Sequence, residues 1–296
     1  MTLTGVYVPL ITPFDATGAA DFAALEALAN ETLAAGASGL VALGTTAEPT
    51  SLNAAEQRGV VDVIARACRE RSAHLLVGAS TVEAVNVLCC RPGVTAALSV
   101  VPPFLRPGEA GVVAHFAALA TVSPVPLVVY HVPYRTGQNL SADAIRRLAD
   151  LDGVVGIKYA VGGIDTATLE LLADLPAEFA VLGGDDAFIS PLLALGAHGG
   201  VLASAHVATA RFVELVDAWR GGTAARARTL GHHLAAISSA MFAEPNPTVI
   251  KAVLHAQGRI PTAAVRLPLL AAGPDAAESA LQQVDTQGHA IVGARR

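Results

Sequence analysis

Lysine is the scarcest charged residue in this chain, which has two lysines and seventeen arginines among its 296 residues. Arginine therefore fills nearly all of the basic positions, and each lysine needs an explanation of its own. Acidic residues outnumber basic ones and give a formal net charge of −6 at pH 7. Because this charge leaves no basic stripe for nucleic acid, small molecules are the predicted partners.

Cysteine is also rare, with three residues in the chain. Cys89 and Cys90 are adjacent, which suits neither metal-ligand spacing nor an easy disulfide, and no histidine pair has the helical spacing of a zinc motif. No metal and no cofactor are predicted. The chain also lacks an unbroken apolar run of membrane-spanning length and a basic segment ahead of an apolar stretch at its N-terminus. These features predict a cytoplasmic protein without a membrane partner.

Short apolar runs alternate with helical patterns along the first 222 residues, as in βα units that build a parallel sheet. Eight such strands, each followed by a helix, predict a (β/α)8 barrel over residues 1–222. Beyond Gly221-Gly222 the strand signal stops, so residues 223–296 are predicted to form a C-terminal helical segment. The predicted strands are Val6–Ile11, Gly39–Leu43, His74–Val77, Ala96–Val101, Leu127–His131, Val154–Lys158, Ala180–Leu182 and Gly200–Leu202.

One of the two lysines ends the apolar run Gly153-Val154-Val155-Gly156-Ile157-Lys158. A buried lysine can lose its proton and attack a carbonyl, whereas a guanidinium stays charged. In a regular strand Val154, Gly156 and Lys158 share one face, and Gly156 would leave space beneath the lysine stem. The ordinary alternative is a strand-end lysine that reaches water. Since the carboxyl ends of barrel strands carry the chemistry, this position favours a catalytic role for Lys158.

Polar residues also follow the second and fifth predicted strands, at the same edge of the barrel. The stretch Gly44-Thr45-Thr46-Ala47-Glu48 combines hydroxyls with free backbone N–H groups, which suits a carboxylate, although an ordinary turn with a capping threonine fits equally well. Tyr130 could present a phenol and Arg135 could bind a second carboxylate through two hydrogen bonds. Their alternatives are a core aromatic residue and a surface charge.

Paired glycines lie at the seventh and eighth strands, within Gly183-Gly184-Asp185-Asp186 and His198-Gly199-Gly200-Val201. Glycine lets a ligand approach the backbone closely, which makes Gly183 a candidate for substrate binding. The same positions often hold phosphate in barrels, and a phosphate-binding lyase is a rival interpretation. However, Asp185 and Asp186 would repel a phosphate dianion. Tight turns capped by aspartates remain the simplest alternative.

Together these stretches resemble the dihydrodipicolinate synthase and N-acetylneuraminate lyase family of pyruvate-dependent class I aldolases. Each motif is weak alone, but their joint order and spacing span nearly the whole chain. The resemblance implies a TIM barrel with a C-terminal helical segment, assembled as a homotetramer or homodimer. The motifs are Leu10-Ile11-Thr12-Pro13-Phe14, Gly44-Thr45-Thr46-Ala47-Glu48, Tyr130-His131-Val132-Pro133, Gly156-Ile157-Lys158, Gly183-Gly184-Asp185-Asp186 and Glu244-Pro245-Asn246-Pro247.

The resemblance also implies roles for single residues. Lys158 lies where the family has its Schiff-base lysine, and Tyr130 where it has the phenol that transfers protons at the imine. Thr45 and Thr46 match the loop that holds the pyruvate carboxylate, and Thr45 also matches the relay hydroxyl. Val201 matches a position that lines the pyruvate pocket.

Three further positions bear on the second substrate. Arg135 resembles the arginine that the dihydrodipicolinate synthase branch uses for the carboxylate of aspartate semialdehyde. Phe104 departs from that branch, because it replaces a tyrosine that a neighbouring subunit contributes to the proton relay. Tyr159 follows the lysine where an acidic residue is usual, and its phenol, or a water molecule, is predicted to replace the missing hydroxyl.

These observations predict an enzyme that forms a Schiff base between Lys158 and pyruvate and then joins pyruvate to aspartate semialdehyde, as in the dihydrodipicolinate synthase branch. The first alternative is an aldolase or dehydratase of a 2-keto-3-deoxy sugar acid, which Phe104 and Tyr159 favour. The second alternative is a homologue that binds a keto acid without turning it over.

Overall fold

Eight parallel strands close into a barrel in the computed structural model, which describes residues 2–176 and 178–292. The strands follow one another around the ring in chain order, and the last pairs with the first through Gly5 opposite Gly199. The predicted TIM barrel is therefore confirmed. The strands are β1 (Gly5–Pro9), β2 (Gly39–Ala42), β3 (His74–Gly78), β4 (Ala96–Val100), β5 (Leu127–His131), β6 (Val154–Tyr159), β7 (Ala180–Gly183) and β8 (Gly199–Val201).

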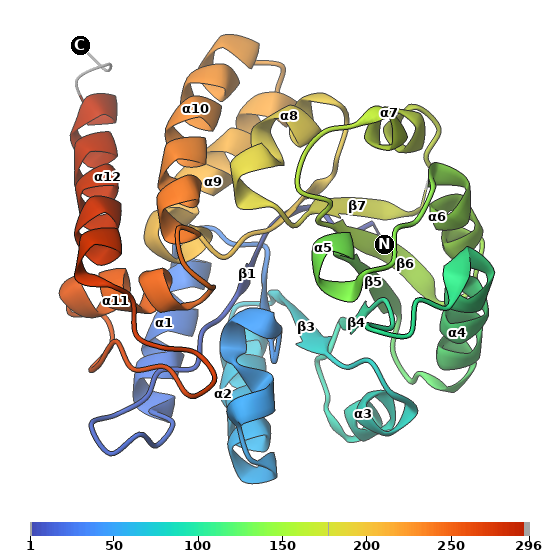
Figure 1. Cartoon of the computed structure of the whole chain (residues 1–296), viewed down its shortest axis with the longest axis horizontal. Coiled ribbons are helices and arrows are strands. Elements are labelled where there is room, and N and C mark those ends of the chain that lie inside the picture. The colour runs from blue at the N-terminus through green and yellow to red at the C-terminus, as the bar shows by residue number, and fades with distance from the viewer. Residues whose placement is uncertain (1, 177, 293–296) are drawn as a thin grey trace.

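Helices surround this ring on its outer side and extend beyond it at the C-terminal end (Figure 1). Side-chain caps begin several of them, among them Asn53, which accepts hydrogen bonds from the backbone N–H groups of Ala55 and Glu56. The α-helices are α1 (Phe22–Ala34), α2 (Ala54–Glu70), α3 (Val82–Asn86), α4 (Gly108–Val122), α5 (Pro133–Thr136), α6 (Ala142–Ala149), α7 (Thr166–Ala173), α8 (Ile189–Ala194), α9 (Ala205–Arg220), α10 (Ala224–Met241), α11 (Thr248–Ala256) and α12 (Pro274–Val292). Short 3-10 helices span Thr45–Ala47, Pro49–Ser51, Val87–Cys90 and Asp186–Phe188.

Two apolar clusters hold the barrel together, because a strand in a closed parallel barrel is buried on both faces. The inner cluster fills the ring and includes Tyr7, Leu76 and Leu182. The outer cluster lies between the strands and the helices and includes Ile157 and Val181. The alternation of these residues along each strand determines which side chains reach the interior.

Strand β6 contains a β-bulge that changes the predicted faces. Leu127 is opposite Val154, but the next residue of β5 is opposite Gly156, so Val155 has no partner across the ladder. Val154 consequently belongs to the outer cluster, while Val155 packs against the inner one. The prediction that Val154 shares a face with Lys158 is wrong, because an extra residue in a bulge reverses the alternation before it.

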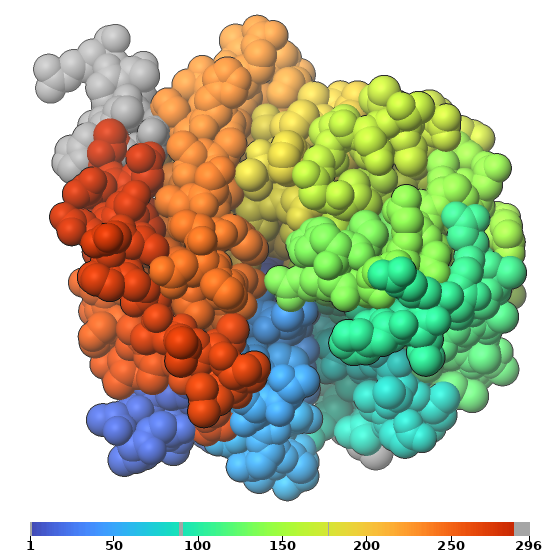
Figure 2. Space-filling view, viewed as in Figure 1, coloured from blue at the N-terminus to red at the C-terminus, as the bar shows by residue number. Residues whose placement is uncertain are grey.

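The C-terminal helices pack along one side of the barrel, beside the N-terminal residues (Figure 2). Helix α10 contacts α9, α12 and the 3-10 helix Asp186–Phe188, which brings the chain after α10 to the mouth of the barrel. The division into residues 1–222 and 223–296 stays a prediction, and residues 293–296 lie outside the described chain, as do the side chains of Cys89 and Cys90. Within the described residues, no helix has the length and apolar character needed to cross a membrane.

Candidate active site

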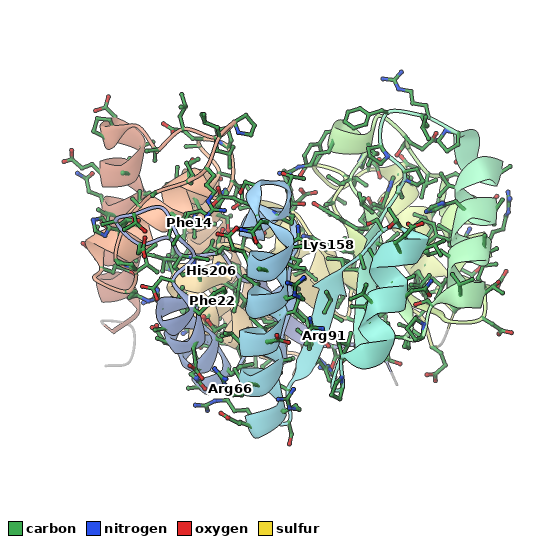
Figure 3. All side chains as sticks on the ribbon, turned by 90° about the horizontal axis from the view of Figure 1, so that it is seen from below. Phe14, Phe22, Arg66, Arg91, Lys158 and His206 are labelled. Carbon is green, nitrogen blue, oxygen red and sulfur yellow. The ribbon has the colours of Figure 1, made fainter. Side chains whose placement is uncertain are left out.

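Lys158 lies at the carboxyl end of β6, with Tyr130 of β5 and Leu182 of β7 opposite it in the ladder. Its side chain is inside the molecule (Figure 3) and the residue is 8% exposed. Burial lowers the pKa of Lys158 to about 8, although Asp186 acts in the opposite direction. About a tenth of the amines are then neutral at pH 7, against about three in ten thousand for an ordinary lysine. The environment therefore makes this amine a competent nucleophile.

The ring of Tyr130 lies beside this amine. The Lys158 Nζ atom lies 4.4 Å from the centroid of the Tyr130 ring. Burial raises the pKa of Tyr130, while the charge of Arg135 and a hydrogen bond with the side chain of Thr45 lower it. The phenol therefore keeps its proton at neutral pH, and it can give that proton up and recover it through Thr45.

A small cavity brings most of the predicted site residues together. Its volume is about 20 Å³, and six of the seven predicted residues line it. This volume holds about one water molecule. Tyr134 and Arg135 are exposed at its mouth, where the Tyr134 hydroxyl donates a hydrogen bond of 3.4 Å to Oδ1 of Asp185. The six residues are Thr45, Thr46, Tyr130, Arg135, Lys158 and Val201.

Gly184, rather than the predicted Gly183, lines this cavity. A Cβ atom on Gly183 would face Ile189 and Leu192, in the outer cluster. A Cβ atom on Gly184 would lie 2.8 Å from Cε of Lys158, closer than real side chains approach. Glycine at position 184 therefore provides the room for the lysine stem.

Gly156 has a different function from the predicted one. A Cβ atom at this position would lie 2.7 Å from the carbonyl oxygen of Ala180. The glycine therefore lets β7 approach β6 closely, and it does not provide the space beneath Lys158. This distinction depends on the packing between neighbouring strands, which the spacing of residues along one strand does not reveal.

Asp186 is a residue of the site that the sequence pattern did not single out. It lines the cavity with Lys158, and its Oδ2 atom accepts a hydrogen bond of 2.5 Å from the backbone N–H of Ser204. Its buried Oδ1 atom has no hydrogen-bond partner among the described residues. Burial raises the pKa of Asp186 to about 6. A carboxylate beside the lysine can stabilise a positive nitrogen in the site.

The sequence showed Asp185 and Asp186 only as an acidic pair after β7. Asp185 makes no side-chain cap in its own turn and instead holds the loop after β6, because its Oδ2 atom accepts a hydrogen bond of 2.6 Å from the backbone N–H of Gly162. Which member of such a pair enters a cavity depends on the fold of the turn, so the pattern alone could not separate them.

The 3-10 helix Thr45–Ala47 forms the wall of the cavity beside β2. Thr46 is buried, and its Oγ1 atom accepts a hydrogen bond of 2.9 Å from Nδ2 of Asn246. Since a hydroxyl can accept and donate at once, the Thr46 proton remains available for a carboxylate. The arrangement suits an anionic group next to the amine.

Tyr159 and Phe104 are the two residues at which the predicted proton relay departs from the family, and neither lines the cavity. Tyr159 points to the outer cluster, where its hydroxyl shares a hydrogen bond of 3.2 Å with Oγ1 of Thr168. The prediction that its phenol replaces the missing hydroxyl is wrong, because neighbouring residues of a strand point to opposite faces and Lys158 points inward. Phe104 is 88% exposed and lies outside the cavity. Water therefore remains the predicted replacement for the relay hydroxyl that is missing at Phe104.

Comparisons with known proteins agree with this geometry. A model of the dihydrodipicolinate synthetase family matches residues 2–287. The 4-hydroxy-tetrahydrodipicolinate synthase of Methanothrix thermoacetophila is 36% identical over 297 residues, covering 99% of both chains. The solved structure of the synthase from Methylacidiphilum fumariolicum SolV has a TM-score of 0.92 at 29% identity and covers 99% of both chains. A monomeric dihydrodipicolinate synthase variant gives a TM-score of 0.90 at 28% identity, with 97% of each chain covered.

Proposed function

Because this chain belongs to the dihydrodipicolinate synthetase family, we propose that it acts as a 4-hydroxy-tetrahydrodipicolinate synthase and joins pyruvate to aspartate semialdehyde through a Schiff base on Lys158. One observation carries the proposal. The buried amine of Lys158 has a pKa lowered to about 8 and shares a cavity with Tyr130 and Thr45. An enzyme that forms an imine with a keto acid needs such a nucleophile and a proton carrier within reach of it.

The proposed reaction begins with attack of the neutral Lys158 amine on the ketone of pyruvate. Tyr130, through Thr45, supplies the proton with which the carbonyl oxygen leaves as water. The positive imine nitrogen then accepts electrons, so the Tyr130 phenolate takes a proton from C3 and an enamine forms. The enamine carbon adds to the aldehyde of the second substrate, whose oxygen takes up this proton, and water then hydrolyses the imine to free Lys158. Thr45 and Thr46 hold the pyruvate carboxylate during these steps, and Asp186 stabilises the positive nitrogen.

Borohydride reduction in the presence of pyruvate tests the first step. We expect one reduced pyruvate unit to become attached to the peptide that contains Lys158. The assignment is unambiguous, because the only other lysine is Lys251 and it lies in a separate peptide. Omission of pyruvate provides the control, and absence of an adduct at Lys158 would contradict the Schiff-base mechanism.

The pH dependence of the same step provides a second prediction. Below about pH 8 the initial rate of adduct formation should rise about tenfold per pH unit, because only the neutral amine attacks. Above that pH the rate should level off, since most Lys158 amines are already neutral. Quenching with borohydride at early times measures this profile. A rate that still rises through about pH 10 would show that Lys158 has the pKa of an ordinary lysine and would contradict this prediction.

Arg135 distinguishes between the candidate second substrates. Its side chain is exposed at the cavity mouth, where a substrate carboxylate can reach it from solvent. Replacing Arg135 with glutamine should raise KM for aspartate semialdehyde about 10- to 100-fold, because a charge-assisted contact to its carboxylate is lost. KM for pyruvate should change much less, since Arg135 acts on Lys158 and Tyr130 only through its charge. Arg147→Gln, an exposed position on α6, is the matched control. Equal KM values for aspartate semialdehyde in the two variants would contradict this role.

The alternative substrate is a 2-keto-3-deoxy sugar acid. Phe104 favours it, because this residue has no hydroxyl at the position where the resemblance places a relay tyrosine. Cleavage of such an acid by an enzyme that ignores aspartate semialdehyde would select this alternative. Adduct formation with pyruvate but no turnover of either partner would instead identify a keto-acid-binding homologue.

Assembly as a homotetramer or homodimer and a cytoplasmic location remain parts of this proposal. Membership of the family does not determine the number of subunits, since a monomeric dihydrodipicolinate synthase variant has nearly the same fold. Sedimentation of the purified chain at several concentrations measures its assembly directly.

A further inference from the structure

The second lysine is buried more deeply than the first. The side chain of Lys251, on α11, is 0% exposed, and its Nζ atom lies 2.5 Å from Oε1 of Glu48, whose side chain is 2% exposed. The ammonium also donates a hydrogen bond of 2.8 Å to the carbonyl of Ala264 and lies 4.0 Å from the centroid of the Phe14 ring. The charge is therefore enclosed by an anion, a carbonyl oxygen and an aromatic face.

Glu48 is the last residue of the Gly44–Glu48 loop that lines the candidate cavity. Its φ of 55° is left-handed, a conformation that only a small fraction of non-glycine residues adopt. Its second carboxylate oxygen accepts a hydrogen bond of 2.8 Å from the backbone N–H of Arg266. Both oxygens of Glu48 are thus held by residues of the C-terminal segment, and the turn that ends the loop is fixed through them.

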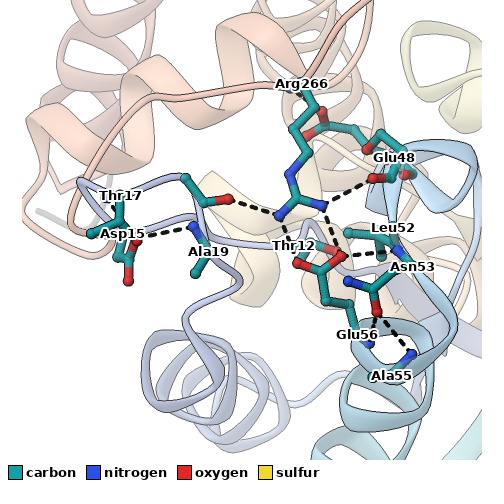
Figure 4. A network of polar contacts seen from close by, with 12 residues as sticks. Thr12, Asp15, Thr17, Ala19, Glu48, Leu52, Asn53, Ala55, Glu56 and Arg266 are labelled. Atoms are coloured by element: carbon teal, nitrogen blue, oxygen red, sulfur yellow. Dashed lines mark hydrogen bonds and ion pairs between the residues drawn. The ribbon is translucent and has the colours of Figure 1, made fainter.

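The same segment contacts the loop and its continuation at other points (Figure 4). Asn246 donates to the hydroxyl of Thr46, and the guanidinium of Arg266 forms two hydrogen bonds, of 2.6 and 2.8 Å, with the carboxylate of Glu56 at the start of α2. The strand side contributes the hydroxyl of Thr12, which donates to the carbonyl of Ala47, and the phenol of Tyr130, which shares a hydrogen bond with the side chain of Thr45. Residues after the barrel therefore hold Thr46 and Glu48, while strand-side residues hold Thr45 and Ala47.

We propose that Lys251 is a positioning residue for keto-acid binding: by pairing with Glu48 it holds the Gly44–Glu48 loop so that Thr45 and Thr46 face Lys158. The C-terminal segment is then a working part of the carboxylate site. The inference rests on the proposed function of that loop. A buried ion pair contributes little net stability but fixes geometry, and substrate binding depends strongly on the orientation of its donors.

The variant that tests this is Glu48→Gln combined with Lys251→Met. The double change removes both charges and keeps the side-chain sizes similar, so no unpaired charge is left in the core, as it would be after Lys251→Met alone. The control is Glu214→Gln with Arg226→Met, which removes an ion pair of 2.7 Å between α9 and α10. That pair also ties the C-terminal segment to the barrel but does not touch the loop.

We expect KM for pyruvate to rise at least about tenfold in the Glu48→Gln, Lys251→Met double variant, and kcat to fall with it because the loop also places the relay hydroxyl of Thr45. KM for aspartate semialdehyde should change less than about threefold. The control should leave all three unchanged. Unchanged KM for pyruvate, or a fall in kcat alone with loss of thermal stability, would show that the pair only supports the fold and would overturn the proposal.

Hydrogen exchange of the backbone amides in residues 44–52 provides a measurement that needs no substrate. Exchange should be at least about tenfold faster in the double variant than in the control. Equal exchange would overturn the proposal even if KM changed. If the unmodified protein gives no pyruvate adduct at Lys158, the proposed function fails, while the exchange result still decides whether Lys251 orders the loop.

Discussion

Replacing Lys158 with methionine is expected to lower turnover about 10⁴-fold or more, because the other lysine of the chain lies outside the cavity and cannot form the imine. Methionine has a similar length and fits the space that Gly184 leaves beside the lysine stem. The adduct with pyruvate should disappear in the same variant. Steady-state assays with pyruvate and aspartate semialdehyde, together with borohydride reduction, measure both effects.

The stability of this variant provides the control for misfolding. Burial lowers the pKa of Lys158 relative to the unfolded chain, so at neutral pH the unfolded state binds the proton more tightly and the lysine weakens the fold. Removing the amine should therefore leave the melting temperature unchanged or higher. Residual activity above about one part in a hundred, in a protein that melts normally, would contradict the role assigned to Lys158.

Replacing Tyr130 with phenylalanine is expected to reduce turnover about 10²- to 10⁴-fold, the usual effect of removing one proton-transfer group. The ring stays in place 4.4 Å from the Lys158 amine, so the packing around the lysine is retained. Imine formation should slow as well, because the leaving oxygen of the ketone loses its proton donor. Rapid-quench trapping at saturating pyruvate measures this step separately.

Tyr159→Phe is the matched control, because it removes a buried phenol hydroxyl from the opposite face of the neighbouring strand. Loss of its hydrogen bond with Thr168 should lower the free energy of unfolding by about 1 kcal/mol and leave turnover within about twofold. Equal losses of activity in the two variants would mean that the Tyr130 hydroxyl transfers no proton.

The barrel was predictable because its strands are short apolar runs and its chemistry collects at their carboxyl ends. Thr45 follows β2, and Tyr130 and Lys158 lie near the carboxyl ends of β5 and β6, so closing the ring was sufficient to bring them together. The bulge before Gly156 was not predictable. Val154 and Val155 are both apolar and fit either face, so nothing in the sequence fixes which one turns inward.

The contacts of the C-terminal segment with the loop could not be predicted from the sequence, because they join residues that are far apart in the chain. Glu48 and Lys251 are 203 positions apart, and no local pattern joins them. The sequence did contain one signal. Lys251 ends the run Thr248-Val249-Ile250-Lys251, in a chain that has only two lysines. The scarcity argument that singled out Lys158 applied equally to Lys251.

The same scarcity affects how this protein responds to amine-directed reagents. Lys251 is enclosed by Glu48 and Phe14, and Lys158 opens only into the small cavity at the barrel mouth. Acylating labels, reductive methylation and glutaraldehyde would thus find no lysine on the outer surface. Apart from the terminal amine, such reagents become selective probes of whether the barrel mouth is open or occupied.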